Sequence, residues 1–446
     1  MATTPPQIEG SNEKVPRRRQ TIAWLLAFGI LVNYFDRVNL SVAKEALNTS
    51  FGVTTAMFGI LSSGYTWTYA LLQVPSGLLL DRFGVKTIGR VSTFLWSVAS
   101  FGASLATGVP TFFMARLVLG VGEAPTFPAN AKAVGYWFPK AERSIGTSIF
   151  DGASKLGVGL GYPVLGLLLY EFGWRWCFAA TGFISLIFFA LFTLYYRNPS
   201  EDPKLTGAER EFIARGGAQP EDKVLAARGA PLGYLLSKKK VWGMCLGYAS
   251  YNYTFYLLLF WLPTFISTAL HTTPVRAALL SSIPWILATA AELFIGGLLV
   301  DKLIEHGWNG DRVRRFVLIV GTSMGLGLVG ATTTSRIPVA LVWITIAIGG
   351  LSAASAIGWS IPSLLAPKES VGTLGGILNT CNQMSALAAG MVTGFIVAHH
   401  SFAPAMGVAA VYLAIGIAGY IFLLGRIEQL PEPPQRTGVV STGAPL

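Results

Sequence analysis

The sequence predicts an all-α membrane protein, with twelve transmembrane helices arranged as two six-helix halves. Apolar residues make up 52% of the 446 residues and charged residues only 12%, and the mean hydropathy is +0.54. A soluble chain of this length needs more charge to cover its surface. Apolar stretches of about twenty residues recur along the chain, which is the length that a helix needs to cross the hydrocarbon core of a bilayer.

The apolar stretches and the polar segments between them divide the chain into five parts. We expect a cytoplasmic N-terminal tail (1–20), a six-helix half (21–196), a cytoplasmic linker that includes a short surface helix (197–240), a second six-helix half (241–425) and a cytoplasmic C-terminal tail (426–446). The predicted spans are 21–42, 58–80, 87–107, 109–131, 145–169, 175–196, 241–265, 277–300, 314–333, 337–361, 371–397 and 403–425.

The net charge of +11 is explained by topology rather than by a nucleic-acid partner. About 26 of the 33 Lys and Arg residues fall on one side of the predicted spans, which is the positive-inside pattern of cytoplasmic loops. The cluster Arg17–Arg19 precedes the first span and is expected to hold the N-terminus in the cytoplasm. That first apolar run is too long for the core of a cleavable signal peptide.

An internal repeat relates the two halves. The stretch GLLLDRFG (77–84) follows the second span, and GLLVDKL (297–303) follows the eighth span at the same offset. Each stretch has a glycine that allows close helix approach, and then an aspartate and a basic residue at the cytoplasmic rim. Repeated halves of this kind place a substrate site between them, near the middle of the membrane.

With the helix count and the central linker, GLLLDRFGVK (77–86) resembles the loop signature of the major facilitator superfamily. The resemblance covers nearly the whole chain. It implies that Gly77, Asp81 and Arg82, with Asp301 in the second copy, belong to a cytoplasmic gate and do not bind substrate.

Four further stretches, NYFDRVNLSVA (33–43), RLVLGVGEAPTFPAN (116–130), WLPTF (261–265) and LGGILNTCNQ (374–383), narrow the family. Together they resemble the anion:cation symporter family, which includes bacterial sugar-acid symporters and the relatives of vesicular glutamate carriers and sialin. The resemblance implies proton-driven uptake of an organic anion across a bacterial inner membrane.

Near the start of the chain, four charged residues lie inside apolar stretches of membrane length: Asp36, Arg37, Arg116 and Glu123. A charge at mid-membrane costs about 2.5–3.5 kcal/mol on insertion scales, so such residues mark ion, proton or substrate paths. Neighbouring helix positions are about 100° apart, so Asp36 and Arg37 are expected to point in different directions.

Arg116 and Glu123 are two helical turns apart on one face. Gly120 between them is expected to leave that face open, and Pro125 and Pro128 are expected to interrupt the helix beyond Glu123.

These four residues suggest a division of roles. Burial favours the protonated form of a carboxyl group and a neighbouring guanidinium favours the ionised form, so Asp36 and Glu123 are the predicted proton-coupling residues. Arg37 is the first choice for binding a substrate carboxylate, because a guanidinium matches its planar shape. Arg116 is then the partner of Asp36 or Glu123, although the two arginines could exchange roles. The alternative is a static buried ion pair.

Ser154 and Lys155 are also predicted to bind the substrate, and they are a departure from the sugar-acid symporters, which tend to carry a glutamine around this position. A cavity-facing Lys155 adds a positive charge, which would favour a second carboxylate or a phosphate on the substrate. The alternative is that Lys155 faces a neighbouring helix or extends to the membrane rim. Glu292, inside the eighth span, is either a second proton site or a helix–helix contact.

Polar and aromatic residues recur at helical spacing in four other spans, namely Tyr65/Tyr69/Gln73, Tyr248/Asn252/Tyr256, Ser352/Ser355/Trp359 and Asn379/Asn382/Gln383. Such donors, acceptors and flat rings suit a polyhydroxylated ligand, but they also stabilise helix contacts in membrane bundles. The family resemblance places Tyr34, Tyr69, Trp359 and Asn379 near the substrate. We also expect Asn252 and Tyr256 to contact it.

The predicted function is secondary active transport, with protons and a small organic anion moving together. The expected substrate is a sugar acid, namely a hexonate, a hexuronate or an aldarate. Alternatives are a non-sugar carboxylate, an aromatic acid or a phosphate ester, or a non-transporting membrane receptor for such an anion. The sequence predicts no enzymatic activity, no cofactor, no metal and no nucleic-acid partner. It predicts a chain that works in the lipid bilayer as a monomer.

Overall fold

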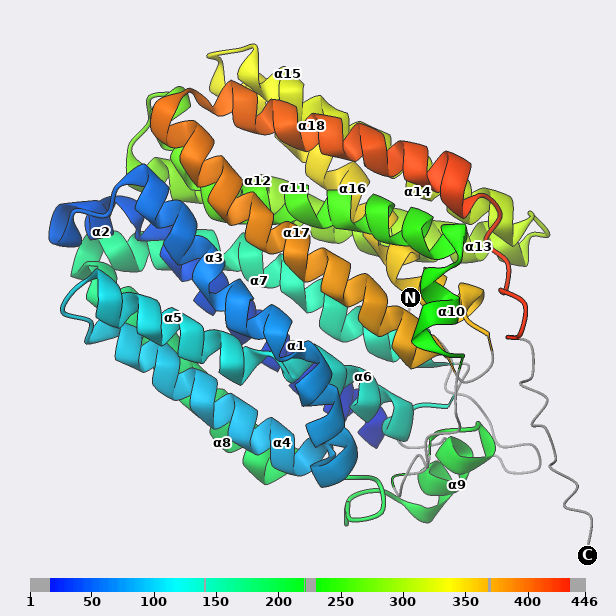
Figure 1. The fold of residues 1–446 in the computed structure, drawn as a ribbon. Coiled ribbons are helices and arrows are strands. Elements are labelled where there is room, and N and C mark those ends of the chain that lie inside the picture. The colour runs from blue at the N-terminus through cyan, green and yellow to red at the C-terminus, as the bar shows by residue number, and fades with distance from the viewer. Residues whose placement is uncertain (1–16, 140–141, 220, 222–229, 368–369, 434–446) are drawn as a thin grey trace, which may run out of the picture.

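The computed structural model describes residues 17–139, 142–219, 221, 230–367 and 370–433, and the described regular structure is entirely helical. The chain forms two bundles that lie side by side, one from its first half and one from its second (Figure 1). The predicted fold class, an all-α membrane protein of two six-helix halves, is therefore confirmed, whereas the bounds of the individual spans stay predictions. Among the described residues, eight helices satisfy length and apolarity requirements for crossing a membrane on their own. The other spans are divided by kinks, merged with a neighbour or interrupted by polar residues.

The helices of the first half are α1 (Arg18–Val42), α2 (Lys44–Phe51), α3 (Thr55–Leu71), α4 (Gln73–Ser104), α5 (Val109–Glu123), α6 (Thr126–Trp137), α7 (Arg143–Phe172) and α8 (Trp174–Tyr195). The linker contains α9 (Gly207–Arg215) and α10 (Leu232–Leu236). The second half comprises α11 (Lys239–Ala269), α12 (Pro274–Ala291), η2 (Glu292–Leu299), α13 (Val300–Glu305), α14 (Gly310–Met324), η3 (Gly325–Gly327), α15 (Leu328–Thr332), α16 (Ile337–Leu365), α17 (Val371–His399), α18 (Phe402–Ala418) and η4 (Gly419–Leu424).

Two breaks in the helices follow from single residues. Gly84, in the repeated GLLLDRFG stretch, has φ of 76°, a conformation that costs glycine little, and the chain turns there from the second span into the third. Pro125 lacks a backbone N–H, and it separates α5 from α6 directly after Glu123. The predicted helix interruption beyond Glu123 is confirmed at Pro125, whereas Pro128 lies in the first turn of α6 and does not break the helix.

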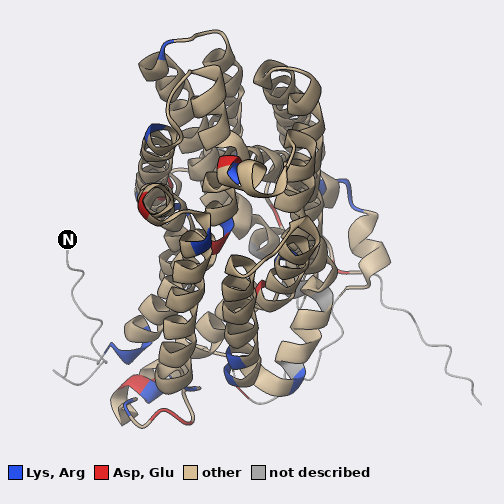
Figure 2. Cartoon of the chain, turned by 90° about the vertical axis from the view of Figure 1, so that its left-hand side faces the viewer, with Lys and Arg blue, Asp and Glu red and all other residues tan. Residues whose placement is uncertain are grey.

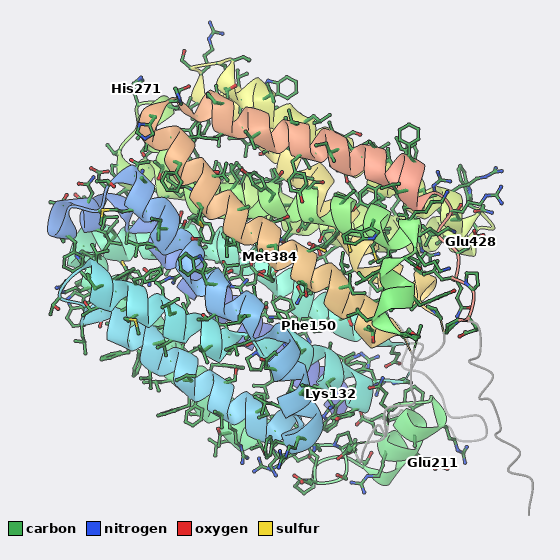
Figure 3. The ribbon with its side chains drawn as sticks, in the orientation of Figure 1. Lys132, Phe150, Glu211, His271, Met384 and Glu428 are labelled. Atoms are coloured by element: carbon green, nitrogen blue, oxygen red, sulfur yellow. The ribbon has the colours of Figure 1, made fainter. Side chains whose placement is uncertain are left out.

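The bundle has two distinct ends, shown in Figure 3. His271 lies at one end, together with α2, and this is called the α2 end. Glu211 of α9 and Glu428, just after the last helix, lie at the opposite end, which is called the linker end. Both the linker and the described C-terminal segment are therefore at one end of the molecule.

Ion pairs attach the linker to the first half at the linker end. The buried Arg19 guanidinium lies 3.0 Å from the Glu209 carboxylate of α9 and 2.7 Å from that of Glu142. Arg18 pairs with Asp202 at 3.0 Å. Apart from such groups at the ends, Figure 2 shows long stretches of ribbon without Lys, Arg, Asp or Glu. Few charged residues therefore lie inside the bundle.

The two halves are pressed together at the α2 end. A Cβ atom added to Gly59 of α3 would lie 2.8 Å from Cα of Gly394 in α17, so the two backbones touch. Ser41 donates a hydrogen bond to the Phe260 carbonyl oxygen at 3.0 Å, and the rings of Phe58 and Trp261 meet edge to face at 5.0 Å. These contacts join helices of opposite halves and close the α2 end.

The halves are further apart at the linker end. Gly77, Gly375 and Gly376 have no neighbouring atom within 4 Å of an added Cβ atom. The close helix approach that the sequence predicts at Gly77 is therefore wrong for this conformation. The α2 end is thus the closed side of the molecule in this conformation.

Candidate functional site

A polar cavity of about 50 Å³ lies between the halves. Its wall is formed by α1, α3, α6 and α7 of the first half and by α11, α16 and α17 of the second half. The lining residues are Tyr34, Arg37, Tyr69, Phe127, Asp151, Lys155, Tyr248, Tyr251, Asn252, Phe255, Tyr256, Trp359, Asn379, Asn382 and Gln383.

Arg37 is the main basic group at one side of this cavity. Its guanidinium lies 3.0 Å from the Glu123 carboxylate, and both side chains are almost fully buried. It also donates a hydrogen bond of 2.9 Å to the hydroxyl of Tyr256, which belongs to the opposite half. The rings of Tyr34 and Tyr69 lie 4.5 and 5.4 Å from its guanidinium carbon, within cation–π range. Aromatic rings and one carboxylate thus hold Arg37 at the cavity wall.

Glu123 reaches Arg37 because α5 packs tightly against α3. A Cβ atom at Gly120 would lie 2.1 Å from the Tyr65 carbonyl oxygen, so only glycine permits this contact. The expectation that Gly120 leaves an open face is therefore wrong, since the face is filled by backbone. One carboxylate oxygen of Glu123, Oε1, has no hydrogen-bond partner within the described residues. A buried acid with one free oxygen is able to accept a proton.

Asp36 points away from the cavity, as its position next to Arg37 predicts. Its Oδ2 accepts a hydrogen bond of 3.1 Å from Ser185 of α8, and the residue is 2% exposed. Its other oxygen has no hydrogen-bond partner among the described residues. Asp36 therefore lies inside the first half, behind the cavity wall.

Arg116 does not pair directly with either acid in this conformation. It donates a 3.3 Å hydrogen bond to the backbone carbonyl oxygen of Asp36, and its Nε and Nη2 atoms have no hydrogen-bond partner in the described part of the chain. The Arg116 side chain lies behind the wall, and the residue does not line the cavity. The geometry thus gives the two arginines different positions, with Arg37 at the cavity and Arg116 between Asp36 and Tyr65, over whose ring it lies at 5.3 Å.

Lys155 lines the cavity and bridges the halves. Its ammonium lies 3.1 Å from Asp151, one turn earlier on α7, and 3.0 Å from Glu292 at the start of η2. The prediction of an extra positive charge that attracts a second anionic group assumed an unpaired lysine. That premise is wrong, because two carboxylates already surround this ammonium. Glu292 makes the helix contact that the sequence left as one of its two possibilities.

Amide side chains of α11 and α17 complete the wall. Asn379 donates a hydrogen bond of 2.8 Å to the side-chain oxygen of Gln73, which joins the halves near the linker end. Gln383 donates to the side-chain oxygen of Asn379 at 3.4 Å, and Asn252 donates to the backbone oxygen of Asn382 at 2.6 Å. The donor groups of these amides are thus used within the protein.

The structure brings together most of the substrate-binding residues that the sequence predicts. All of them except Arg116 and Ser154 line the cavity, and their contact with substrate stays a prediction. Ser154 is buried at 1% exposure and is not part of the cavity wall. Arg82 is exposed at the linker end, whereas the side chains of Asp81 and Asp301 lie outside the part of the chain that the structure describes.

Sequence reasoning missed several residues of the wall. Asp151 is the most informative, because its position four residues before Lys155 on one helix is a signal for an ion pair. Tyr251 and Phe255 were missed because the helical spacing of Tyr248, Asn252 and Tyr256 marked only one side of α11. No sequence signal links Ser185 to Asp36, since they come from helices far apart in the chain.

Comparison with known proteins identifies the fold family. The sequence pattern of the Major Facilitator Superfamily matches residues 26–390. The chain belongs to this superfamily. The internal repeat, the two halves and the cavity between them are features of the same architecture, and the resemblance to the anion:cation symporter family is consistent with the relatives described next.

Three relatives align with almost their entire length. An uncharacterized transporter of Bacillus subtilis, YybO, is 36% identical over 94% of this chain and 98% of its own. The probable galactarate/D-glucarate transporter GarP of Escherichia coli is 30% identical over 92% of this chain and 96% of its own. A D-galactonate transporter of Escherichia coli is 28% identical over 94% of this chain and 99% of its own.

Solved structures of transporters share the fold. A bacterial homologue of the human lysosomal transporter Spinster, in an inward-facing and occupied conformation, has a TM-score of 0.71 at 17% identity, covering 92% of this chain and 99% of that chain. The inward-open xylose transporter XylE of Escherichia coli has a TM-score of 0.71 at 15% identity, covering 94% and 98%. Both share the fold of this chain.

Proposed function

We propose that this protein is a secondary active transporter that couples the uptake of a sugar acid to the movement of protons. The observation that carries the proposal is the Arg37–Glu123 ion pair at the wall of the cavity between the halves. A guanidinium held by one carboxylate can exchange that carboxylate for the one on a substrate. The enzymatic alternative is set aside, since the superfamily consists of transporters.

The substrate class is supported by the cavity and by the relatives. The wall combines one arginine with several tyrosines and amides, which suits a molecule with one anionic end and several hydroxyl groups. The relatives include a probable galactarate/D-glucarate transporter and a D-galactonate transporter. We therefore assign a six-carbon sugar acid as the substrate.

Proton coupling follows from competition for Arg37. When a substrate carboxylate binds Arg37, Glu123 loses its counter-ion in a buried, water-poor place. A carboxylate left there without a partner is strongly disfavoured, so it takes up a proton. Substrate binding and protonation of Glu123 then occur together, and the reverse exchange releases both.

Asp36 is proposed as a second proton-coupling group. It lies behind the cavity wall with Arg116 close by, and its carboxylate accepts a hydrogen bond from the Ser185 hydroxyl. A shift of Arg116 toward or away from Asp36 would change the charge that the carboxylate experiences. Since α1 carries both Arg37 and Asp36, movement of this helix connects the two sites.

The proposal also covers the orientation of the protein in the membrane and the residues that close its cytoplasmic side. We propose that the linker end faces the cytoplasm of a bacterial inner membrane, with both termini there, because basic residues concentrate in that part of the chain. Gly77, Asp81, Arg82 and Asp301 would then close the cytoplasmic side in the opposite conformation. The cavity is complete within one chain, so a monomer is the proposed working unit.

The test is uptake into proteoliposomes that hold the purified protein under an imposed inward proton gradient. Labelled sugar acids and simple carboxylates of matched charge are compared, with protein-free liposomes as the control. The proposal expects accumulation of a sugar acid that disappears when an ionophore collapses the gradient. Accumulation of only simple or aromatic carboxylates would contradict the substrate class, and binding without any transport would favour the receptor alternative.

A further inference from the structure

The cavity wall has a second set of charged side chains, in which one basic residue contacts two acidic residues. Lys155 on α7 and Glu292 on η2 belong to different halves, and their charged atoms are 3.0 Å apart. Asp151 lies 3.1 Å from the same ammonium. Asp151 and Lys155 both line the cavity, whereas Glu292 stands behind them. This set is called the Lys155 cluster.

The Lys155 cluster carries more negative than positive charge when its three groups are ionised. One ammonium faces two carboxylates, so one negative charge is in excess. The Asp151 side chain is 13% exposed, compared with 3% for Lys155, so the acid is the more accessible of the two from the cavity. By contrast, the Arg37 guanidinium is balanced by a single carboxylate. A substrate carboxylate is therefore attracted to Arg37 and repelled by the Lys155 cluster.

Amide side chains of the cavity wall add to this difference between Arg37 and the Lys155 cluster. Asn382 and Gln383 line the cavity at 2% and 6% exposure, and their side-chain oxygens have no hydrogen-bond partner among the described residues. The Gln383 amide donates one N–H to the Asn379 side-chain oxygen. The unpaired oxygens of Asn382 and Gln383 are buried in this conformation, so a ligand reaches them only where the wall opens around it. A buried acceptor without a donor is costly, and a hydroxyl group supplies a donor whereas a carboxylate cannot.

We infer that the Lys155 cluster and these amides form a hydroxyl-reading subsite that selects a monocarboxylate sugar acid, an aldonate or a uronate, over a dicarboxylate aldarate. The carboxylate of the substrate binds at Arg37, and its hydroxylated remainder donates hydrogen bonds to Asp151, Asn382 and Gln383. The inference rests on the proposed function and narrows its substrate class. It also replaces the sequence-based expectation that Lys155 favours a second anionic group.

The experiment compares two six-carbon acids that differ at one end. Galactonate carries a hydroxymethyl group where galactarate carries its second carboxylate. Dissociation constants for both are measured by calorimetry on the purified full-length protein near pH 7, where all these carboxylates are ionised in solution. Like-charge contact costs several kcal/mol, so wild type is expected to bind galactonate at least about tenfold more tightly.

Variants identify the residue that discriminates between galactonate and galactarate. Asp151→Asn removes the excess negative charge and is expected to bring the two dissociation constants within about threefold of each other, while Asp151→Glu keeps the preference. Glu292→Gln changes the same charge from behind the wall and is expected to act in the same direction. Glu211→Gln, which neutralises an exposed acid on α9, is the control and should keep the wild-type ratio.

The possible outcomes distinguish failure of this inference from failure of the proposed function. Equal or tighter binding of galactarate by wild type overturns the inference and leaves the proposed function standing. A preference for galactonate that Asp151→Asn and Glu292→Gln leave unchanged also overturns it, because the selection then comes from another part of the wall. If neither acid binds while wild type is folded, the proposed sugar-acid function fails and the inference fails with it.

Discussion

The Glu123 carboxylate lies 3.0 Å from the Arg37 guanidinium, although the two residues are 86 positions apart in the chain. The pair joins the end of α5 to the last part of α1, and the same guanidinium donates a hydrogen bond to Tyr256 in the other half. One cation therefore contacts a buried carboxylate, the cavity wall and the second bundle. The account of coupled transport depends on this arrangement.

Arg37→Lys is expected to weaken sugar-acid binding by about ten- to one hundredfold, although the charge is kept. A lysine ammonium cannot contact a carboxylate through two parallel N–H groups and at the same time reach the Tyr256 hydroxyl. Calorimetry on the purified protein measures the change. Arg215→Lys, at an exposed pair on α9, is the matched control. Unchanged affinity in Arg37→Lys would move the carboxylate contact away from this residue.

Glu123→Gln is expected to separate transport from the proton gradient. The amide still accepts a hydrogen bond from Arg37 but cannot carry a proton, so accumulation driven by the gradient is lost. Exchange of labelled for unlabelled substrate across the membrane should persist, since it needs no net proton movement. Counterflow and gradient-driven uptake are measured in the same proteoliposome preparation. Full accumulation by this variant would show that Glu123 is not a coupling site.

Gly59→Leu is expected to shift the protein toward the conformation that is open at the α2 end. A side chain at this position meets the backbone of α17, with Cα of Gly394 only 2.8 Å from the new Cβ atom, and backbone cannot move aside locally. Distances between spin labels on α2 and α15 should therefore increase. Gly407→Leu is the control, because nothing lies within 4 Å of a Cβ atom there. Unchanged distances in Gly59→Leu would argue against closure by this contact.

Lys44 makes closure of the α2 end dependent on pH. It lies just beyond the first membrane span, 5.5 Å from the Phe58 ring and 5.1 Å from the Trp261 ring, which come from opposite halves. Burial lowers the pKa of the Lys44 ammonium to about 8, and the nearby Glu45 opposes this only in part. In an open, hydrated conformation its pKa returns toward the ordinary value of about 10.4. The closed form then binds fewer protons, so raising the pH from about 8 to about 10 should favour closure.

Spin-label distances between α2 and α15, measured across this pH range, test the effect of Lys44. The expected result is a growing closed population in wild type and no such trend in Lys44→Gln. Lys240→Gln, at an exposed pair with Glu428 on the other end, should behave like wild type. A trend that survives in Lys44→Gln would assign the pH dependence to another group.

The fold was predictable in nearly all its parts because each span is a local pattern. Apolar length predicted the twelve helices, and Pro125 predicted where α5 ends. Gly120 and Gly77 show the limit of such reasoning, since the sequence predicts that a glycine is special but not what lies opposite. Gly120 meets the backbone of α3, whereas Gly77 has an empty neighbourhood in this conformation.

The site was predictable as a set of residues but not as a set of pairs. Buried charge identified Arg37, Glu123 and Lys155, since each is costly in a membrane without a partner. Which acid meets which base depends on how distant helices are arranged. The clearest example is Lys155, whose charge is compensated by Glu292 from the opposite half. That pairing removes the premise of an unpaired lysine, on which the expected preference for a second anionic group depended.

The most direct test of the account is to record substrate-induced proton movement in proteoliposomes that contain a pH-sensitive dye and start without any pH gradient. Adding the sugar acid outside should acidify the lumen in wild type, beyond any change in protein-free liposomes. The Glu123→Gln variant should bind the acid without that acidification. Uptake of the labelled acid by wild type with no accompanying proton movement would contradict the claim that substrate and protons travel together.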